Sequence, residues 1–250
     1  MFSLSGRVAL VTGGNGGLGR AIAGGLRRFG AAVAVTGRNP EKNALVAFEF
    51  GEDVVFELDV RDEAAVVRVV ALVAERLGGL DILVNNAGVG LGGPVTELEQ
   101  HDWDAVVDTH LTGSFLCSKH AARRMDGERN GKIVNIGSMY SFFGPPRFAA
   151  YAAAKSGILG LTRSLAVELA PSIQVNAILP GWFETDLTRG MPQTERGDEI
   201  RRRTPAGRWG DPDELVGTAV FLSSSASDFV TGAAVPVGGG YSVADRLLHE

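Results

Sequence analysis

The sequence has little of the features that would place a protein in several specialised classes. Its one cysteine, Cys117, cannot form an internal disulfide, which is typical of a reducing compartment. A formal net charge of -5 gives no excess of positive charge for a nucleic-acid surface. No run is apolar for the length of a bilayer, and Met1–Gly6 show no basic and apolar regions of a secretory signal. We therefore expect a cytoplasmic protein without nucleic-acid or membrane partners.

Short apolar runs alternate with helical patterns along almost the whole chain. Continuous apolar runs are typical of strands buried on both faces, and they predict strands at Val8–Thr12, Ala32–Thr36, Val54–Leu58, Asp81–Val84, Lys132–Ile136, Ile173–Ile178 and Ala233–Val237. Helices are predicted at Leu18–Phe29, Ala64–Leu77, Trp103–Met125, Ala149–Leu169 and Pro212–Leu222. This alternation indicates a single α/β domain over residues 1–250, with a seven-stranded parallel sheet.

One connection, from Gly181 to Trp209, is too long for a plain loop and carries Gly, Pro, Thr and mixed charges. Long connections in compact domains often form lids or binding loops. We therefore predict a substrate lid around residues 181–209. The run Arg201–Arg203 within it is more typical of a solvated helix face than of an anion site.

The first predicted strand leads into a glycine-rich turn, and a helix begins there. Glycines let the backbone approach a pyrophosphate closely, and the helix N-terminus supplies free N–H groups and the positive end of its dipole. Although glycine also serves plain turns, its position in a βαβ unit predicts a dinucleotide site. The expected contacts are Gly13, Asn15, Gly17, Leu18 and Gly19.

The end of the second predicted strand bears on the choice between NAD and NADP. A carboxylate there would bind the ribose 2′-hydroxyl, but the chain has Arg38, which can pair with a 2′-phosphate or be a solvated loop residue. We predict a preference for NADP. Asp59 and Val60 would border the adenine, unless Asp59 only caps a helix. Further cofactor contacts are expected after the fourth strand, at Asn86, Ala87 and Gly88, although these residues also suit an ordinary turn.

Candidate catalytic residues follow the fifth predicted strand. Ser138 could hold a substrate oxygen, and Tyr151 and Lys155 are spaced to lie one turn apart on the same helix face. A free tyrosine titrates at about pH 10, and a neighbouring ammonium would lower that value toward neutrality. A tyrosine and a lysine at this spacing also occur by chance on amphipathic helices, so the pair alone proves little.

The ordered set of motifs resembles the short-chain dehydrogenase/reductase family over essentially the whole chain. The motifs are Thr12-Gly13-x-x-x-Gly17-x-Gly19, Asn85-Asn86-Ala87-Gly88, Ser138, Tyr151-x-x-x-Lys155 and Pro180-Gly181. The resemblance implies a doubly wound Rossmann domain that moves a hydride between NAD(P) and a carbonyl or secondary alcohol, and it implies a homotetramer.

The resemblance also assigns roles to residues. Tyr151 would be the general acid/base, and Ser138 would orient the substrate oxygen. Lys155 would bind the nicotinamide ribose and lower the pKa of Tyr151. Tyr151 and Lys155 would thus border the cofactor, together with Pro180, Gly181 and Thr185, whose hydroxyl would meet the nicotinamide carboxamide.

Three positions depart from the family pattern. Most members have an asparagine where this chain has His110, which could keep an altered proton relay and titrate near neutrality, or be structural, or weaken the enzyme. His110 is therefore a fourth candidate catalytic residue. Gly16 stands where NADP-binding members often have a basic residue, and Gly238 replaces a usual aspartate. The histidines show no metal-ligand spacing, so we expect no catalytic metal.

The substrate is less well defined by the sequence. Pro205–Gly210 and Ser223–Asp228 resemble stretches of the family's sugar-acid enzymes, such as gluconate 5-dehydrogenases and 2-deoxy-gluconate 3-dehydrogenases, and also of its 3-oxoacyl-carrier-protein reductases. A sugar, polyol or sugar acid is expected first, and a 3-oxoacyl thioester or another small ketone next. A nucleotide sensor is a further alternative. Arg147 or Arg189 could receive a carboxylate, and the expected substrate contacts are Ser138, Tyr140, Tyr151, Trp182 and Phe183.

Overall fold

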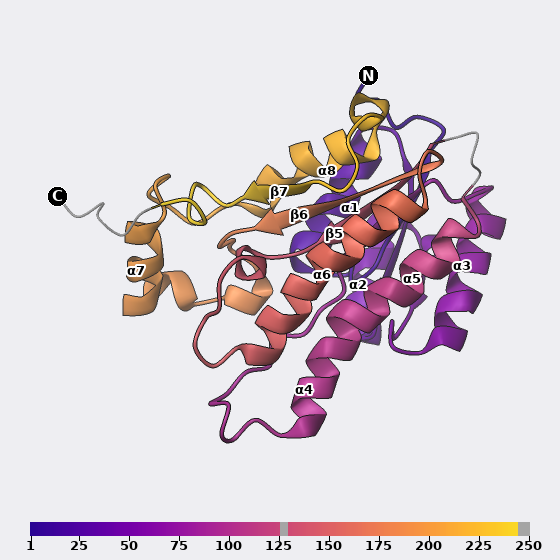
Figure 1. The fold of residues 1–250 in the computed structure, drawn as a ribbon. Coiled ribbons are helices and arrows are strands. Elements are labelled where there is room, and N and C mark those ends of the chain that lie inside the picture. The colour runs from indigo at the N-terminus through magenta and orange to yellow at the C-terminus, as the bar shows by residue number, and fades with distance from the viewer. Residues whose placement is uncertain (126–129, 245–250) are drawn as a thin grey trace.

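A computed structural model describes residues 1–125 and 130–244 of the chain. Its centre is a seven-stranded sheet with the strand order β3-β2-β1-β4-β5-β6-β7, in which every neighbouring pair is parallel (Figure 1). The strands are β1 Val8–Val11, β2 Ala32–Gly37, β3 Val55–Glu57, β4 Ile82–Asn85, β5 Gly131–Ile136, β6 Ile173–Pro180 and β7 Ala234–Val237. The predicted fold class is confirmed, because all seven predicted strands form and belong to one parallel sheet.

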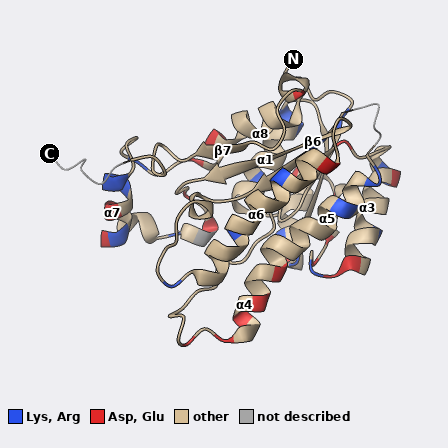
Figure 2. Cartoon of the chain, viewed as in Figure 1, with Lys and Arg blue, Asp and Glu red and all other residues tan. Residues whose placement is uncertain are grey.

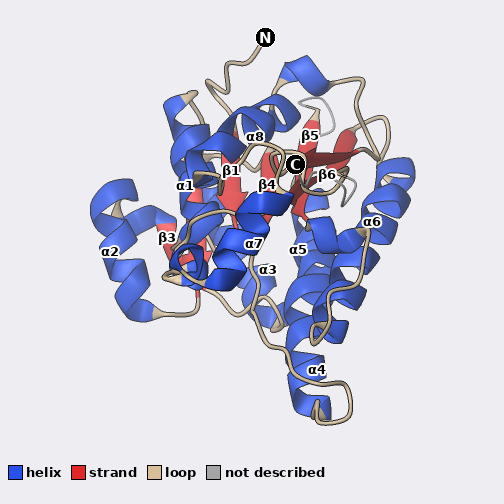
Figure 3. Cartoon of the chain, turned by 90° about the vertical axis from the view of Figure 1, so that its left-hand side faces the viewer, coloured by secondary structure: helices blue, strands red, loops and turns tan. Residues whose placement is uncertain are grey.

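Helices cover both faces of this sheet (Figure 3). One apolar core joins the sheet to α1 (Gly17–Arg28), α2 (Pro40–Phe50) and α8 (Val216–Ser223). A second core joins the other face to α3 (Glu63–Leu77) and α5 (Gly113–Ala122). The remaining α-helices are α4 Gln100–Val107, α6 Ala149–Glu168 and α7 Glu195–Arg203. Each fully buried Leu, Ile or Val side chain in such cores contributes about 1.5–3 kcal/mol relative to exposure.

The long helix predicted at Trp103–Met125 differs from the one observed. It consists of α4, a π-helical turn at Asp108–Thr112 and α5, which ends at Ala122. The helix predicted at Pro212–Leu222 begins as a 3-10 turn, Pro212–Leu215, before α8. Two helices, α2 and α7, form where the sequence predicts none.

The strand order reverses between β1 and β4, the place where open parallel sheets bind ligands at their carboxyl ends. The connection after β6, including α7, lies beyond the carboxyl end of that strand (Figure 1). Most of the predicted site residues follow β1, β2, β4, β5 or β6, so the fold gathers them at this edge. Within the described residues, no helix is both long and apolar enough to cross a membrane.

Candidate active site

The turn between β1 and α1 has the geometry of an anion cradle. Gly13 and Gly17 have φ values of +62° and +50°, which favour glycine. A Cβ atom on Gly19 would lie 2.3 Å from the Asn86 side chain and 2.4 Å from the Gly13 carbonyl oxygen. No side chain caps α1, and its first turn contains no acidic residue, so its first N–H groups remain for an anion. These features fit the pyrophosphate of a dinucleotide.

Thr12 and Asn86 hold this turn against β4. The Thr12 hydroxyl accepts hydrogen bonds from the backbone N–H groups of Asn86 and Ala87, at 3.0 and 3.1 Å. The side-chain nitrogen of Asn86 donates to the carbonyl oxygens of Thr12 and Gly13, at 3.0 and 3.1 Å. Asn86, predicted as a cofactor contact, therefore positions the turn. Thr12 belongs to the sequence motif, but its strand-joining role depends on contacts that only the folded chain shows.

Two networks surround the end of β2. Arg61 holds Asp59 with an ion pair of 2.6 Å, and its hydrogen bonds keep the pKa of Asp59 below its usual value. Arg38 approaches the same carboxylate only to 3.8 Å, and its side chain is about half exposed. Asn15 donates to Asn43 at 2.8 Å, and Asn43 donates to the Gly37 carbonyl at 2.9 Å. Arg61 and Asn43 were missed in the sequence because neither belongs to a motif.

Val60 and Gly88, which follow β3 and β4, approach the region around the π-helical turn. A Cβ atom on Gly113 would lie 2.5 Å from Val60, which is buried, and one on Gly88 would lie 2.3 Å from the His110 ring. Gly88 thus allows the loop after β4 to lie against His110. Val60, predicted to border the adenine, packs against the first residue of α5.

Ser138, Tyr151 and Lys155 come together between β5 and α6. Burial raises the pKa of Tyr151, and a hydrogen bond with Ser138 offsets only part of this effect. The Lys155 Nζ atom lies over the Tyr151 ring, 5.6 Å from its centre, and donates to the Ile136 carbonyl at 2.5 Å. Burial lowers the pKa of Lys155 to about 7.

The predicted lowering of the Tyr151 pKa by Lys155 is therefore wrong for the chain by itself. The ammonium lies over the face of the ring, and Lys155 is itself partly neutral near pH 7 because of its burial. A raised pKa keeps the Tyr151 phenol protonated at neutral pH, the form that donates a proton to a carbonyl oxygen. Ser141 supports this arrangement, since its hydroxyl donates to the Lys155 carbonyl at 2.7 Å.

His110 lies in the π-helical turn with its ring edge-on to Tyr151, at 5.1 Å between ring centres. Its Nε2 atom is 3.1 Å from the backbone nitrogen of Val89 and 2.9 Å from the Val89 carbonyl oxygen. The Nδ1 atom is buried and has no hydrogen-bond partner among the described residues. Burial, together with the charge of Lys155, lowers the pKa of His110 to about 3. The predicted titration near neutrality is wrong, because this ring is neutral at pH 7.

An aromatic wall continues from Tyr151. The ring of Tyr140 lies edge-on to the rings of Tyr151 and Trp182, at 6.2 and 6.1 Å between centres. Two predicted substrate contacts, Tyr140 and Trp182, thus lie beside the candidate catalytic tyrosine. Phe183 does not join them, since its ring packs against Gly210 and belongs to the buried core.

The chain leaving β6 is fitted closely to the glycine turn and to β7. Thr185 lies against Gly17, with its Cβ atom 3.7 Å from where a Cβ on that glycine would be. A Cβ atom on Gly181 would lie 2.6 Å from Gly238, and one on Gly238 would lie 2.9 Å from Gly181. Gly238 therefore stands at a close backbone contact between the ends of β6 and β7. Pro180 ends β6 at the same point.

Residues 181–209 contain α7 and two short 3-10 turns, Asp186–Thr188 and Met191–Gln193. Ile200 and Trp209 pack with Met139 and Tyr241 in a small apolar cluster. Within the Arg201–Arg203 run, Arg201 pairs with Asp198 and Arg203 lies 4.4 Å from the centre of the Tyr241 ring. Among residues 1–125 and 130–244, no group of histidine, cysteine or acidic side chains could hold a metal ion.

Comparisons with known proteins agree with this geometry. A family model described as enoyl-(acyl carrier protein) reductase matches residues 13–242. The chain is 42% identical to a gluconate 5-dehydrogenase of Gluconobacter oxydans, over 97% of each chain. It is 36% identical to a 3-oxoacyl-[acyl-carrier-protein] reductase of Aquifex aeolicus, over 95% of this chain and 98% of that one. A crystal structure of a gluconate 5-dehydrogenase from Burkholderia cenocepacia, in complex with NADP and tartrate, is 40% identical, with a TM-score of 0.91 and 98% of each chain covered.

Proposed function

We propose, because this chain belongs to the short-chain dehydrogenase/reductase family, that it interconverts a keto group and a secondary hydroxyl group of a sugar acid. The chain is an NAD(P)-dependent oxidoreductase. The observation that carries the proposal is the meeting of Ser138, Tyr151 and Lys155 beside an aromatic wall, in a chain 42% identical to a gluconate 5-dehydrogenase. Uncharged sugars and polyols, which carry the same hydroxylated carbon chain, are the related substrate classes.

The residues divide the chemistry as follows. A nicotinamide cofactor held along the carboxyl edge of the sheet would supply or accept the hydride. Tyr151 donates its phenolic proton to the carbonyl oxygen during reduction, and accepts it back during oxidation. The Ser138 hydroxyl orients the same oxygen. Lys155 borders the nicotinamide ribose and passes protons to Tyr151, and neutral His110 supports that relay through its Nδ1 atom.

A Tyr151→Phe variant tests whether the chain is an enzyme or a nucleotide sensor. Because it removes the proton donor and leaves the ring, we expect kcat to fall by about 10²–10⁴-fold, with NADPH affinity retained. The measurement is nicotinamide absorbance against sugar acids, sugars and 3-oxoacyl thioesters, together with calorimetric titration of NADPH. Phe142→Leu, an exposed aromatic change nearby, is the control. Equal turnover by Tyr151→Phe would remove Tyr151 from the chemistry, and no turnover by the parent protein on any class would favour a sensor.

We propose that the chain prefers NADP to NAD through Arg38. The negative charge of Asp59 is already paired with Arg61, so Arg38 is only loosely paired with it. Arg38 follows the end of β2, where the ribose 2′-phosphate would lie. Other expected cofactor contacts are Gly13, Asn15, Gly17, Leu18, Gly19, Ala87, Gly88, Pro180, Gly181 and Thr185.

Arg38→Gln should therefore weaken NADPH binding by about tenfold or more, as for loss of a charge-assisted hydrogen bond. NADH binding should stay the same, since it has no 2′-phosphate. Calorimetric titration of both nucleotides measures this, with exposed Arg68→Gln on α3 as the control. Tighter binding of NADH than NADPH by the parent protein would refute the preference.

The second candidate function is reduction of a 3-oxoacyl thioester. It is supported by 36% identity to a 3-oxoacyl-[acyl-carrier-protein] reductase and by the description of the matching family model. The same panel separates the two functions, because a thioester reductase would turn over 3-oxoacyl thioesters far faster than keto sugar acids.

We further propose that residues 181–209 act as a lid over a single catalytic domain of residues 1–250, of which residues 245–250 lie outside the described part. We also propose that the protein forms a homotetramer in the cytoplasm.

A further inference from the structure

A hollow of about 480 Å³ adjoins the aromatic wall through one of its lining residues, Arg196, which lies over the Trp182 ring. It lies where the loop after β4, the segment before α6 and the start of α7 meet, and it is lined by Gly92, Pro146, Arg147, Phe148, Glu195, Arg196 and Glu199. Phe148 directly precedes α6, one helical turn before Tyr151. Phe148 thus links the hollow to the helix that carries the candidate catalytic tyrosine.

Arg147 is held in this hollow by an unusual backbone. Its φ of +68° lies in the left-handed region, which is strained for a residue with a Cβ atom. Its carbonyl oxygen accepts a hydrogen bond of 2.8 Å from the N–H group of Gly93. A Cβ atom on Gly92 would lie 2.6 Å from the same carbonyl oxygen and 2.8 Å from the Phe148 ring. Backbone strain that the surroundings enforce in this way is found most often at functional sites.

Arg196, on α7, connects the hollow to the aromatic wall. Its guanidinium lies over the Trp182 ring, 6.0 Å from the ring centre. It also interacts with Tyr140: burial raises the pKa of that phenol to about 12, and Arg196 opposes the shift. Since Tyr140 contacts Tyr151, one chain of rings runs from Arg196 to the proton donor.

No ion pair balances the charge of either arginine within the described residues, and Arg196 also hydrogen-bonds to Tyr140. Figure 2 shows basic and acidic residues together on α7. Glu195 and Glu199 line the same hollow, yet neither forms an ion pair with Arg147 or Arg196 within the described chain. By contrast, Arg189, the other anion-binding candidate from the sequence, is paired with Asp186.

We infer that Arg196, assisted by Arg147, binds the carboxylate of the substrate at the end of its chain away from the reacting carbon. The inference rests on the proposed sugar-acid function and makes it specific, because a guanidinium is suited to hold a carboxylate by two parallel hydrogen bonds. Trp182 and Tyr140 then lie along the hydroxylated carbons between Arg196 and Tyr151. Selectivity for acids over neutral sugars is assigned to Arg196.

Two ketones test this assignment in the full-length enzyme with NADPH. They are 5-keto-D-gluconate and L-sorbose, which has a hydroxymethyl group in place of the carboxylate. We expect Arg196→Gln to raise KM for the keto acid by about tenfold or more, with little change in kcat and none in kcat/KM for L-sorbose. Arg147→Asn, which tolerates the left-handed backbone, should give a smaller change in the same direction. Arg202→Gln, an exposed arginine on the same helix α7, is the matched control and should change the kinetics of neither substrate.

A binding measurement separates failure of this inference from failure of the proposed function. D-gluconate and uncharged D-glucitol are titrated calorimetrically into the enzyme–NADPH complex, where no turnover occurs. Tighter binding of gluconate that is lost in Arg196→Gln supports the subsite. If the parent enzyme reduces keto acids but Arg196→Gln leaves KM and gluconate binding unchanged, the subsite is refuted and the function stands. If the enzyme reduces only 3-oxoacyl thioesters, and gluconate binds no better than glucitol, both are refuted.

Discussion

At the scale of single residues, burial decides the protonation of the site. Lys155 and His110 are buried and Tyr151 is partly buried beside them, and burial disfavours the charged form of each group. It raises the pKa of Tyr151, lowers that of Lys155 to about 7 and lowers that of His110 to about 3. The site of the chain by itself therefore carries less charge at neutral pH than its residue types suggest.

His110 gives a pH-dependent prediction about stability. Between pH 6.5 and 3 the unfolded chain binds a proton on His110, whereas the folded chain does not, because its pKa is lowered to about 3. The free energy of unfolding should thus decrease as the pH is lowered through this window, by up to about 1.4 kcal/mol per pH unit. His110→Asn removes this contribution, so its stability should fall less steeply from pH 6.5 to 4. Urea unfolding at several pH values measures the difference.

The control for this prediction is His101→Asn, because His101 has a side chain that is 78% exposed. It should leave the pH dependence of unfolding as in the parent protein. The same variants test the proposed relay, in which His110→Asn should change turnover or its pH profile while His101→Asn does not. If the free energy of unfolding depends on pH in the same way for His110→Asn and for the parent, the pKa of His110 is not lowered by folding, and the prediction fails.

At the scale of helices and strands, the sequence predicts elements that have a regular local pattern of apolar residues. It misses features that depend on contacts with other parts of the fold. The strands were predictable because buried parallel strands are continuously apolar, as in Val8–Val11. The helix α2 was missed although Asn39 and Pro40 carry a start signal, with Asn39 capping the Lys42 N–H group. The π-helical turn was not predictable, because the residue pattern from α4 to α5 is that of one continuous helix. Only the backbone hydrogen bonding changes at Asp108–Thr112.

The candidate site follows the same division. Ser138, Tyr151 and Lys155 were predictable because a strand end and one helical turn fix their relative places. The roles of Arg61 and Arg196 were not, because each depends on a partner from another element, Asp59 in one case and Trp182 in the other. The pKa of Tyr151 was predicted with the wrong sign, since spacing gives proximity to Lys155 but not the extent of burial.

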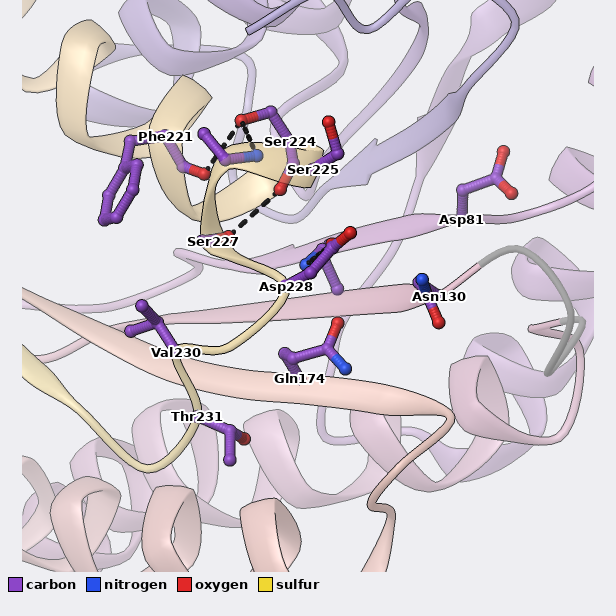
Figure 4. A network of polar contacts seen from close by, with 12 residues as sticks. Asp81, Asn130, Gln174, Phe221, Ser224, Ser225, Ser227, Asp228, Val230 and Thr231 are labelled. Atoms are coloured by element: carbon purple, nitrogen blue, oxygen red, sulfur yellow. Dashed lines mark hydrogen bonds and ion pairs between the residues drawn. The ribbon is translucent and has the colours of Figure 1, made fainter. Parts of the chain in front are cut away.

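At the scale of the whole molecule, the two edges of the sheet have different roles. The carboxyl edge gathers the candidate site, and the opposite edge is held by polar contacts around the loop before β7 (Figure 4). There Ser227 donates to the Ser224 carbonyl at 3.1 Å. Lys132, fully buried at the start of β5, pairs with Asp228 at 2.7 Å. Burial lowers the pKa of Lys132, and Asp228 opposes that shift.

This pair predicts that stability and activity can be separated. Asp228→Asn leaves the Lys132 charge buried without its carboxylate, and we expect a loss of about 1–3 kcal/mol, less than for a wholly buried pair because Asp228 is 43% exposed. Lys132→Met removes the charge and its desolvation, so it should cost less than Asp228→Asn. Adding Lys132→Met to Asp228→Asn should restore part of the loss.

Urea unfolding measures these differences, and kcat/KM should stay within about twofold of the parent in all three variants, since neither residue touches the carboxyl edge. A larger loss from Lys132→Met than from Asp228→Asn would mean that the packing of the lysine stem, and not its charge, holds this edge. A fall in kcat/KM without a fall in stability would mean that the two edges of the sheet are coupled. Equal stability of Asp228→Asn and the parent would show that the Lys132 charge needs no carboxylate there.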